Sequence, residues 1–101
     1  MQHWLVGNIA GCDFRLGQTL SQYVGAAPGE GTGAHRFVFL LFAQPSPLNF
    51  NEPMLDFSLT GRPSFDIRAF AQKYQLVLYG GNFFTAEFDD SVPSLLSALG
   101  A

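Results

Sequence analysis

The side chains best suited to bind an anion gather around one histidine. His35 and Arg36 directly follow a segment with four glycines, residues 25–34. Backbone N–H groups of such a loop can surround an anion, and a histidine and an arginine beside it can bond to a phosphate. An ordinary turn explains the same residues, with Arg36 then paired to a carboxylate such as Asp89 or Asp90. The motif alone favours the turn.

Metal and catalytic chemistry find little support in the other reactive side chains. His3 stands alone in an apolar stretch, where a structural role is the commoner one. Two histidines are too few for a zinc site. Cys12 is the only cysteine, so an internal disulfide is excluded, and nothing in the pattern pairs it with His35 as a nucleophile. Residues 29–34, GEGTGA, lead into a strand and not into the helix a phosphate loop needs. We expect no cofactor and no enzymatic activity.

Composition narrows the class of protein. The 101 residues suit one small domain, and 48% hydrophobic against 13% charged residues excludes a disordered chain. A net charge of −3 with scattered basic residues argues against nucleic acid as a partner. The longest apolar run, Phe37–Ala43, is too short to span a membrane. The single cysteine fits a reducing compartment, and we expect a cytoplasmic location.

Sequence patterns predict about three strands, with open sheet edges that invite pairing with another chain. The segment Arg36–Gln44 is the strongest strand, because its continuous apolar run suggests burial on both faces. A proline-rich connector follows it, residues 45–53. The other two strands are expected at His3–Ile9 and Asn82–Phe88, and Leu20–Val24 is expected to be a short extended piece.

Two helices are expected after the connector. Residues 63–74 begin with a capping Ser64 and with an Asp66 that suits the positive end of the helix. A last helix starts near Asp89–Ser91, with Pro93 in its first turn. Their apolar faces are Ile67, Phe70, Ala71 and Tyr74 in the first helix, and Leu95, Leu96 and Leu99 in the second.

The motifs HWLVGNI, GAHRFVFLLFAQ, FDIRAFAQKYQL and GGNFFTAEFDDSVPSLLSAL, in this order, resemble the phosphatidylethanolamine-binding protein family over nearly the whole chain. The resemblance implies a mostly β fold with helices near the C-terminus, a Greek-key β-sandwich with an anion pocket at one end. It makes ligand binding the leading interpretation at both histidines. The residues it assigns to the pocket are His3, Val24, Gly25, Ala27, Pro28, His35 and Phe37.

The sequence also departs from the family pattern. The D-P-D-A-P segment that supplies the pocket carboxylates is absent, and Gln2 replaces the first histidine of the family's H-H-W pair. Phe37 stands where a tyrosine is common, and Leu96 stands where many animal members have a ligand-contacting tyrosine. We therefore expect residues 1–101 to form a partial domain, equivalent to the C-terminal half.

The family resemblance implies a non-enzymatic module that binds an anionic small molecule or phospholipid head group. It further implies a kinase or a serine protease as the protein partner. A structural domain like that of mitochondrial large-subunit ribosomal proteins is one alternative, and a fragment without independent function is another. Free strand edges also allow a homodimer formed by strand exchange.

Overall fold

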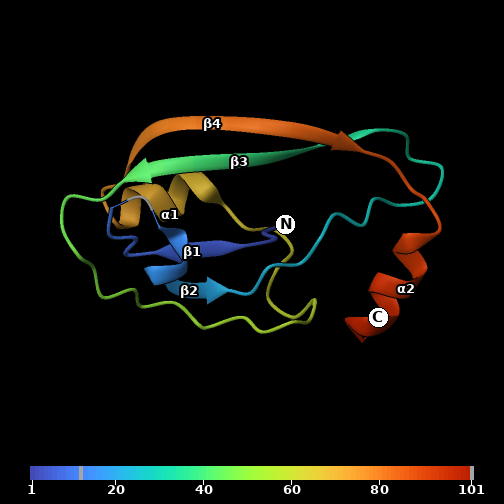
Figure 1. Ribbon diagram of the computed structural model, residues 1–101, viewed down its shortest axis with the longest axis horizontal. Helices are drawn as coiled ribbons and strands as arrows, with labels where there is room; N and C mark the ends of the chain where they lie inside the picture. The colour runs from blue at the N-terminus through green and yellow to red at the C-terminus, as the bar shows by residue number, and fades with distance from the viewer. Residues whose placement is uncertain (12, 101) are drawn as a thin grey trace.

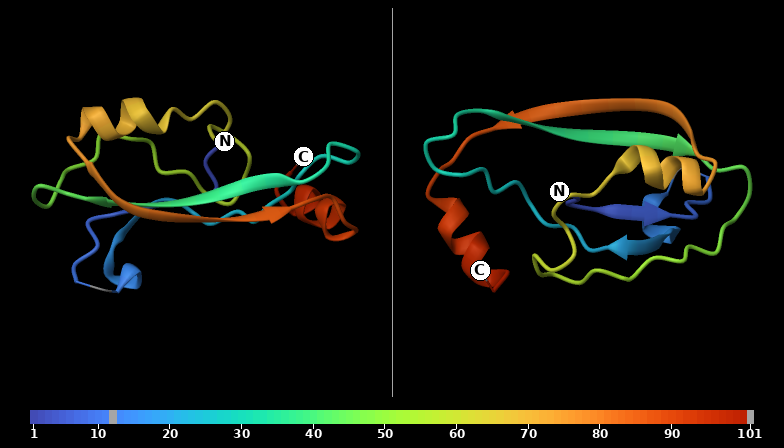
Figure 2. Two further views of the ribbon diagram at one scale, coloured as in Figure 1. Left: turned by 90° about the horizontal axis from the view of Figure 1, so that it is seen from above. Right: turned by 180° about the vertical axis from the view of Figure 1, so that it is seen from behind.

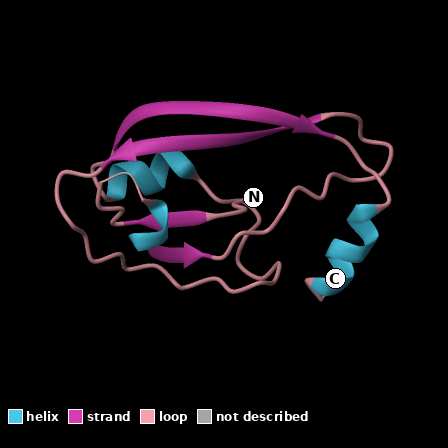
Figure 3. Ribbon diagram, viewed as in Figure 1, coloured by secondary structure: helices cyan, strands magenta, loops and turns pink. Residues whose placement is uncertain are grey.

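The computed structural model describes residues 1–11 and 13–100, so Cys12 lies outside the described residues. Two helices and four strands follow each other in a mixed order (Figures 1 and 3). The elements are β1 (Leu5–Gly7), a 3₁₀ turn (Phe14–Leu16), β2 (Gln18–Ser21), β3 (His35–Ala43), α1 (Ile67–Lys73), β4 (Val77–Ala86) and α2 (Ser91–Ala98). The glycine-rich segment 25–34 and the connector 45–53 contain neither helix nor strand, as predicted.

The strands form two antiparallel pairs, β1 with β2 and β3 with β4. The β3–β4 ribbon runs along the length of the molecule, with α1, β1 and β2 at one end and α2 at the other (Figures 1 and 2). This mixture of strands and two helices agrees with the expected class. The Greek-key sandwich is not confirmed, because each sheet has only two strands among the described residues.

Strand β4 is longer than the predicted strand Asn82–Phe88, since it begins at Val77 and ends at Ala86. The glycines Gly80 and Gly81 obscured its first half, because glycine usually weakens a strand. Here a side chain at Gly81 would place its Cβ 2.8 Å from the carbonyl oxygen of Phe39. Glycine therefore permits the close approach of the two strands at this point.

The expectation that the segment Arg36–Gln44 is buried on both faces is wrong. Val38 and Leu41 point to opposite faces of β3 and remain 61% and 55% exposed. An apolar run is buried only where a further layer covers it. Among the described residues β3 pairs with β4 alone, and only Phe37 and Phe42 of the strand are partly covered.

The principal core lies between the β1–β2 pair and α1. It is built from Leu20, Phe50 and Phe70, with Leu5 and Tyr74 packed against them. Phe50 stacks on Phe70 at 6.1 Å between ring centroids. A side chain at Gly7 would collide with the Phe50 ring, since its Cβ would lie 2.4 Å from a ring carbon. Gly7 thus lets the connector close over β1.

Helix α1 begins at Ile67, and its N-cap lies two residues after the predicted one. Ser64 does not cap it, because its backbone adopts a left-handed φ of 62°. Asp66 is the N-cap, and its carboxylate accepts hydrogen bonds from the backbone N–H groups of Arg68 and Ala69. The predicted apolar face is confirmed, with Phe70 buried and Tyr74 partly buried.

Helix α2 begins at Ser91, and Pro93 lies in its first turn as expected. Asp89 accepts hydrogen bonds from the backbone N–H and the hydroxyl of Ser91. These hydrogen bonds lower the pKa of Asp89. Leu99 is buried and Leu95 partly buried, so the apolar face of this helix is also confirmed.

Candidate functional site

The imidazole of His3 is fixed by the loop that follows β2. Its Nδ1 lies 3.0 Å from the carbonyl oxygen of Val24, and the backbone N–H of Val24 donates to the carbonyl of His3 at 2.8 Å. A carbonyl oxygen can only accept, so Nδ1 carries the proton. No described residue forms a hydrogen bond with the second ring nitrogen, Nε2.

An aromatic stack connects His3 to the β3–β4 ribbon. The ring of His3 meets Phe37 edge to face, with 5.3 Å between centroids. Phe37 stacks on its cross-strand partner Phe84, also at 5.3 Å. Edge-to-face and stacked arrangements are the favourable ones for aromatic pairs. The stack therefore fixes one side of the histidine against an apolar surface.

His35 is held by the glycine-rich loop. The hydroxyl of Thr32 donates to the carbonyl of Gly29 at 2.6 Å, and its oxygen lies 2.7 Å from Nε2 of His35. Because the hydroxyl proton points to Gly29, the oxygen accepts from Nε2–H, and Nδ1 of His35 stays available. Thr32 was missed by sequence reasoning, although a threonine three residues before a histidine is spaced for such a contact.

Three of the seven predicted site residues, His3, His35 and Phe37, lie at one end of the ribbon. His35 and Phe37 are two positions apart on β3, so their side chains share a face. Phe37 meets His3 on that face. The site combines two imidazoles, each with one free nitrogen, and an aromatic surface. Such a group can donate hydrogen bonds to an anion when protonated, while its apolar side packs against carbon.

The four remaining predicted pocket residues lie in the loop between β2 and β3. Val24 and Pro28 are buried, and Ala27 is partly buried. Gly25 faces α2, since a Cβ there would lie 3.7 Å from a methyl carbon of Leu95. Val24 contacts His3 directly. A ligand-binding role for these residues stays a prediction.

Arg36 does not form the ion pair that the turn interpretation predicted for it. No described carboxylate lies within ion-pair distance of Arg36, and Asp89 bonds to Ser91 instead. The Arg36 guanidinium carbon lies 6.0 Å from the centroid of the Phe83 ring. Arg36 follows His35 on β3 and so faces away from the His35–Phe37 side.

Arg62 anchors the backbone behind His3 and was not singled out from the sequence. Its side chain is fully buried, and it donates to four carbonyls, including those of His3 and Gln22. Burial lowers the pKa of Arg62, while the nearby Asp56 carboxylate opposes that change. Four of the five guanidinium N–H donors have carbonyl acceptors, so this charge is a structural one.

Within residues 1–11 and 13–100, no three His, Cys, Asp or Glu side chains are grouped as metal ligands. The same residues contain no helix with the length and apolar character required to cross a bilayer.

A family model for phosphatidylethanolamine-binding protein matches residues 1–84. The chain belongs to the phosphatidylethanolamine-binding protein family. A relative from Drosophila melanogaster, named "Putative odorant-binding protein A5", is 36% identical over 99 residues, which are 96% of this chain and 47% of the relative. The match confirms the resemblance inferred from the motifs around His3 and His35.

A solved structure, "CG7054 solution structure", shares 34% identity and a TM-score of 0.75 with the chain. The match covers 96% of this chain and 56% of that one. This chain thus spans about half of the length of these two relatives. The architecture in Figure 1 is accordingly similar to about half of a known structure of the same fold.

Proposed function

We propose that the chain is a non-enzymatic module that binds an anionic small molecule or phosphate-bearing head group at His3, His35 and Phe37. The supporting observation is that each imidazole has one nitrogen bonded to the protein, while no described residue bonds to the other. Nδ1 of His3 is held by Val24, and Nε2 of His35 is held by Thr32. A fixed ring presents its free nitrogen to a ligand at low entropic cost.

The experiment compares phosphorylethanolamine with ethanolamine in thermal melts of the full chain. A ligand that prefers the folded state raises the melting temperature, and the rise grows with ligand concentration. We expect a rise with phosphorylethanolamine only. The variant His35→Gln keeps a side-chain N–H donor that can reach Thr32 but loses the free ring nitrogen, so the rise should fall sharply. An unchanged rise in His35→Gln contradicts the proposal.

Arg68 supplies a matched control for general charge effects. It is exposed on α1, an element that carries neither histidine. Arg68→Gln should leave the ligand-induced rise as it is in the unmodified chain. An equal loss in Arg68→Gln and His35→Gln would mean that phosphate acts through net charge and not through a site.

We extend the proposal to regulation of a kinase or a serine protease, as the family resemblance suggests. Inhibition assays with a serine carboxypeptidase and with a protein kinase test it, and unchanged rates at saturating protein refute it.

A cytoplasmic location belongs to the same proposal, and imaging of the tagged protein tests it. The ribosomal alternative finds no support in the comparisons.

A homodimer is the proposed assembly. Residues 37–43 of β3 and 77–84 of β4 carry no charged side chain. Nine of their large apolar side chains are exposed. These side chains lie together on two paired strands, unlike the single apolar residues that are scattered over most protein surfaces. Because the surface carries no charge, two copies can pair there without repulsion between like charges. Light scattering after size exclusion tests the assembly.

A further inference from the structure

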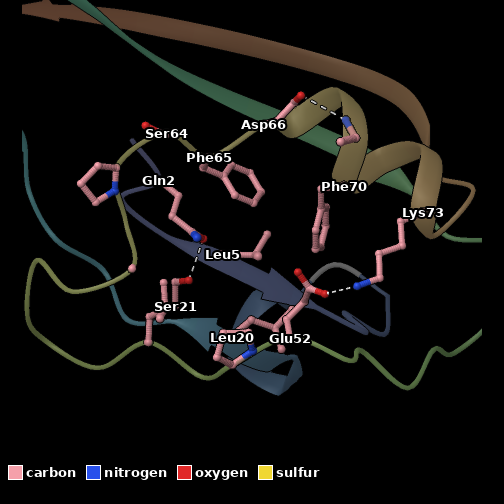
Figure 4. A pocket seen from close by; sticks show the side chains of 15 residues that line it. Gln2, Leu5, Leu20, Ser21, Glu52, Ser64, Phe65, Asp66, Phe70 and Lys73 are labelled. Carbon is pink, nitrogen blue, oxygen red and sulfur yellow. Dashed lines mark hydrogen bonds and ion pairs between the residues drawn. The ribbon is translucent and has the colours of Figure 1, made fainter.

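A half-open cavity of about 400 Å³ is lined by β1, β2, α1 and the loop segments 52–55 and 61–66, apart from the histidine site (Figure 4). This volume falls in the range of roughly 300–1,000 Å³ that small-molecule pockets occupy. None of the seven residues expected at the anion site lines it. The cavity is therefore separate from the proposed anion site.

The floor of the cavity is the principal core of the fold. Leu5, Leu20, Phe65 and Phe70 line it, and Leu20 and Phe70 are almost fully buried. The Phe70 ring is held by Phe65 at 5.6 Å and by Phe50 at 6.1 Å between centroids. A floor fixed in this way is preformed and favours an apolar ligand.

Charged groups at the cavity rim already have partners. Nζ of Lys73 lies 2.6 Å from Glu52, which also accepts from the hydroxyl of Tyr74 at 2.8 Å. Hydrogen bonds from Lys73 and Tyr74 lower the pKa of Glu52. The carboxylate of Asp66 caps α1. A charged ligand would have to displace one of these partners, whereas a neutral ligand would not.

The amide of Gln2 brings spare hydrogen-bond donors to the cavity without a charge. The Ser21 hydroxyl donates to Oε1 of Gln2 at 2.8 Å. The amide nitrogen carries two N–H donors, and no described residue accepts from them. Figure 4 shows the Gln2 side chain extending into the cavity beside Ser21. A ligand oxygen could accept a hydrogen bond there.

We propose that this cavity binds a small neutral molecule with an apolar body and one acceptor oxygen, such as an alcohol, ketone or ester. The apolar body packs on the partly exposed side chains of Leu5, Leu55 and Phe65 above this floor, and the oxygen accepts from the amide of Gln2. This site is separate from the anion site, and either one can be present without the other.

The first test titrates the labelled full chain with octanol, octanoate and octylamine, which share one chain length and differ in charge. We expect octanol to shift the amide resonances of Leu20 and Phe70 saturably in two-dimensional NMR spectra. Octanoate and octylamine should bind at least about tenfold more weakly, because each brings a charge into an apolar site. Equal binding of either charged probe overturns the proposal. Shifts centred on Phe39 and Phe83 would overturn it too, since they would place octanol on the exposed ribbon.

A pair of tryptophan variants provides the second test. Ala69 lines the cavity from α1, whereas Gln72 is exposed on the same helix and does not line it. Ala69→Trp should fill the cavity and reduce octanol affinity at least about tenfold, while Gln72→Trp should leave it unchanged. Equal affinity in both variants refutes the cavity as the site. If Ala69→Trp fails to fold by circular dichroism, the resonance map of the unmodified chain still decides.

A histidine variant keeps the two sites distinguishable. His35→Gln should bind octanol like the unmodified chain while losing the response to phosphorylethanolamine. Loss of octanol binding in His35→Gln would mean that one site serves both ligands, and it would overturn the separate cavity.

Discussion

Nδ1 of His3 donates to the carbonyl oxygen of Val24 across 3.0 Å, although 21 positions separate the two residues in sequence. This bond joins the start of the chain to the loop between β2 and β3, beside the proposed anion site. It gives His3 a structural role beside the proposed binding role.

These two roles of His3 can be separated. Asparagine places a side-chain N–H donor close to the position of Nδ1, so His3→Asn should keep most of the stability, whereas His3→Ala should lose about 1 kcal/mol. Both variants lack Nε2 and should lose the melting-temperature rise with phosphorylethanolamine. Urea unfolding and thermal melts give the two readouts. A full ligand response in His3→Asn would restrict this histidine to structure.

Arg62 should be among the most sensitive positions for stability. Arg62→Met removes the donors that four backbone carbonyls use, including the carbonyl of His3. Unpaired buried acceptors should cost at least about 3 kcal/mol in the free energy of unfolding. Arg68→Met, on the exposed side of α1, should change it by less than about 0.5 kcal/mol. Denaturant unfolding measures both, and equal effects would contradict the role assigned to Arg62.

The capping of α1 offers a direct comparison of two neighbouring residues. Asp66→Ala removes the acceptor for two backbone N–H groups and should cost about 1 kcal/mol. Ser64→Ala should cost less than about 0.5 kcal/mol, because Ser64 makes no cap. Urea unfolding measures both losses of stability. A larger loss for Ser64→Ala than for Asp66→Ala would mean that Ser64 is the cap.

Stability should fall in acid partly through Glu52. Its pKa in the folded chain is lowered from 4.5, first by the hydrogen bond from Lys73. The contribution is therefore complete above pH 4.5 and is lost as the pH falls through the lower folded value. Glu52→Gln should be less stable at pH 7 by up to about 1 kcal/mol, and the difference should vanish in acid. A pH series of unfolding curves checks this, and a constant difference would contradict it.

Self-association should depend on the exposed ribbon. Phe83 is 56% exposed on β4. Leu16, which is distant from Phe83 in sequence, is 72% exposed in the 3₁₀ turn. Phe83→Lys should shift the protein towards the monomer, since it places a charge in the proposed interface. Leu16→Lys adds the same charge elsewhere and should not. Light scattering at several concentrations separates the two, and equal masses for both variants would exclude the ribbon as interface.

Local pattern was sufficient to locate most of the elements. The apolar run of β3, the helical spacing of Phe70 and Tyr74, and the leucines of α2 are properties of neighbouring residues. The alternation that places His35 and Phe37 on one face follows from strand geometry alone. The motifs around these residues also identified the family, which the family model confirmed.

Only the tertiary structure decided which segments meet and which faces are covered. The contact of Arg62 with the carbonyl of His3 joins positions 59 residues apart, and no periodicity encodes it. The exposure of β3 depends on whether another layer packs on it, and an apolar run indicates only that it suits one. The cavity under α1 likewise arises from four segments that are separate in sequence. Spacing in the sequence determines on which face of its helix or strand a side chain lies. Packing between elements determines which other side chains it contacts.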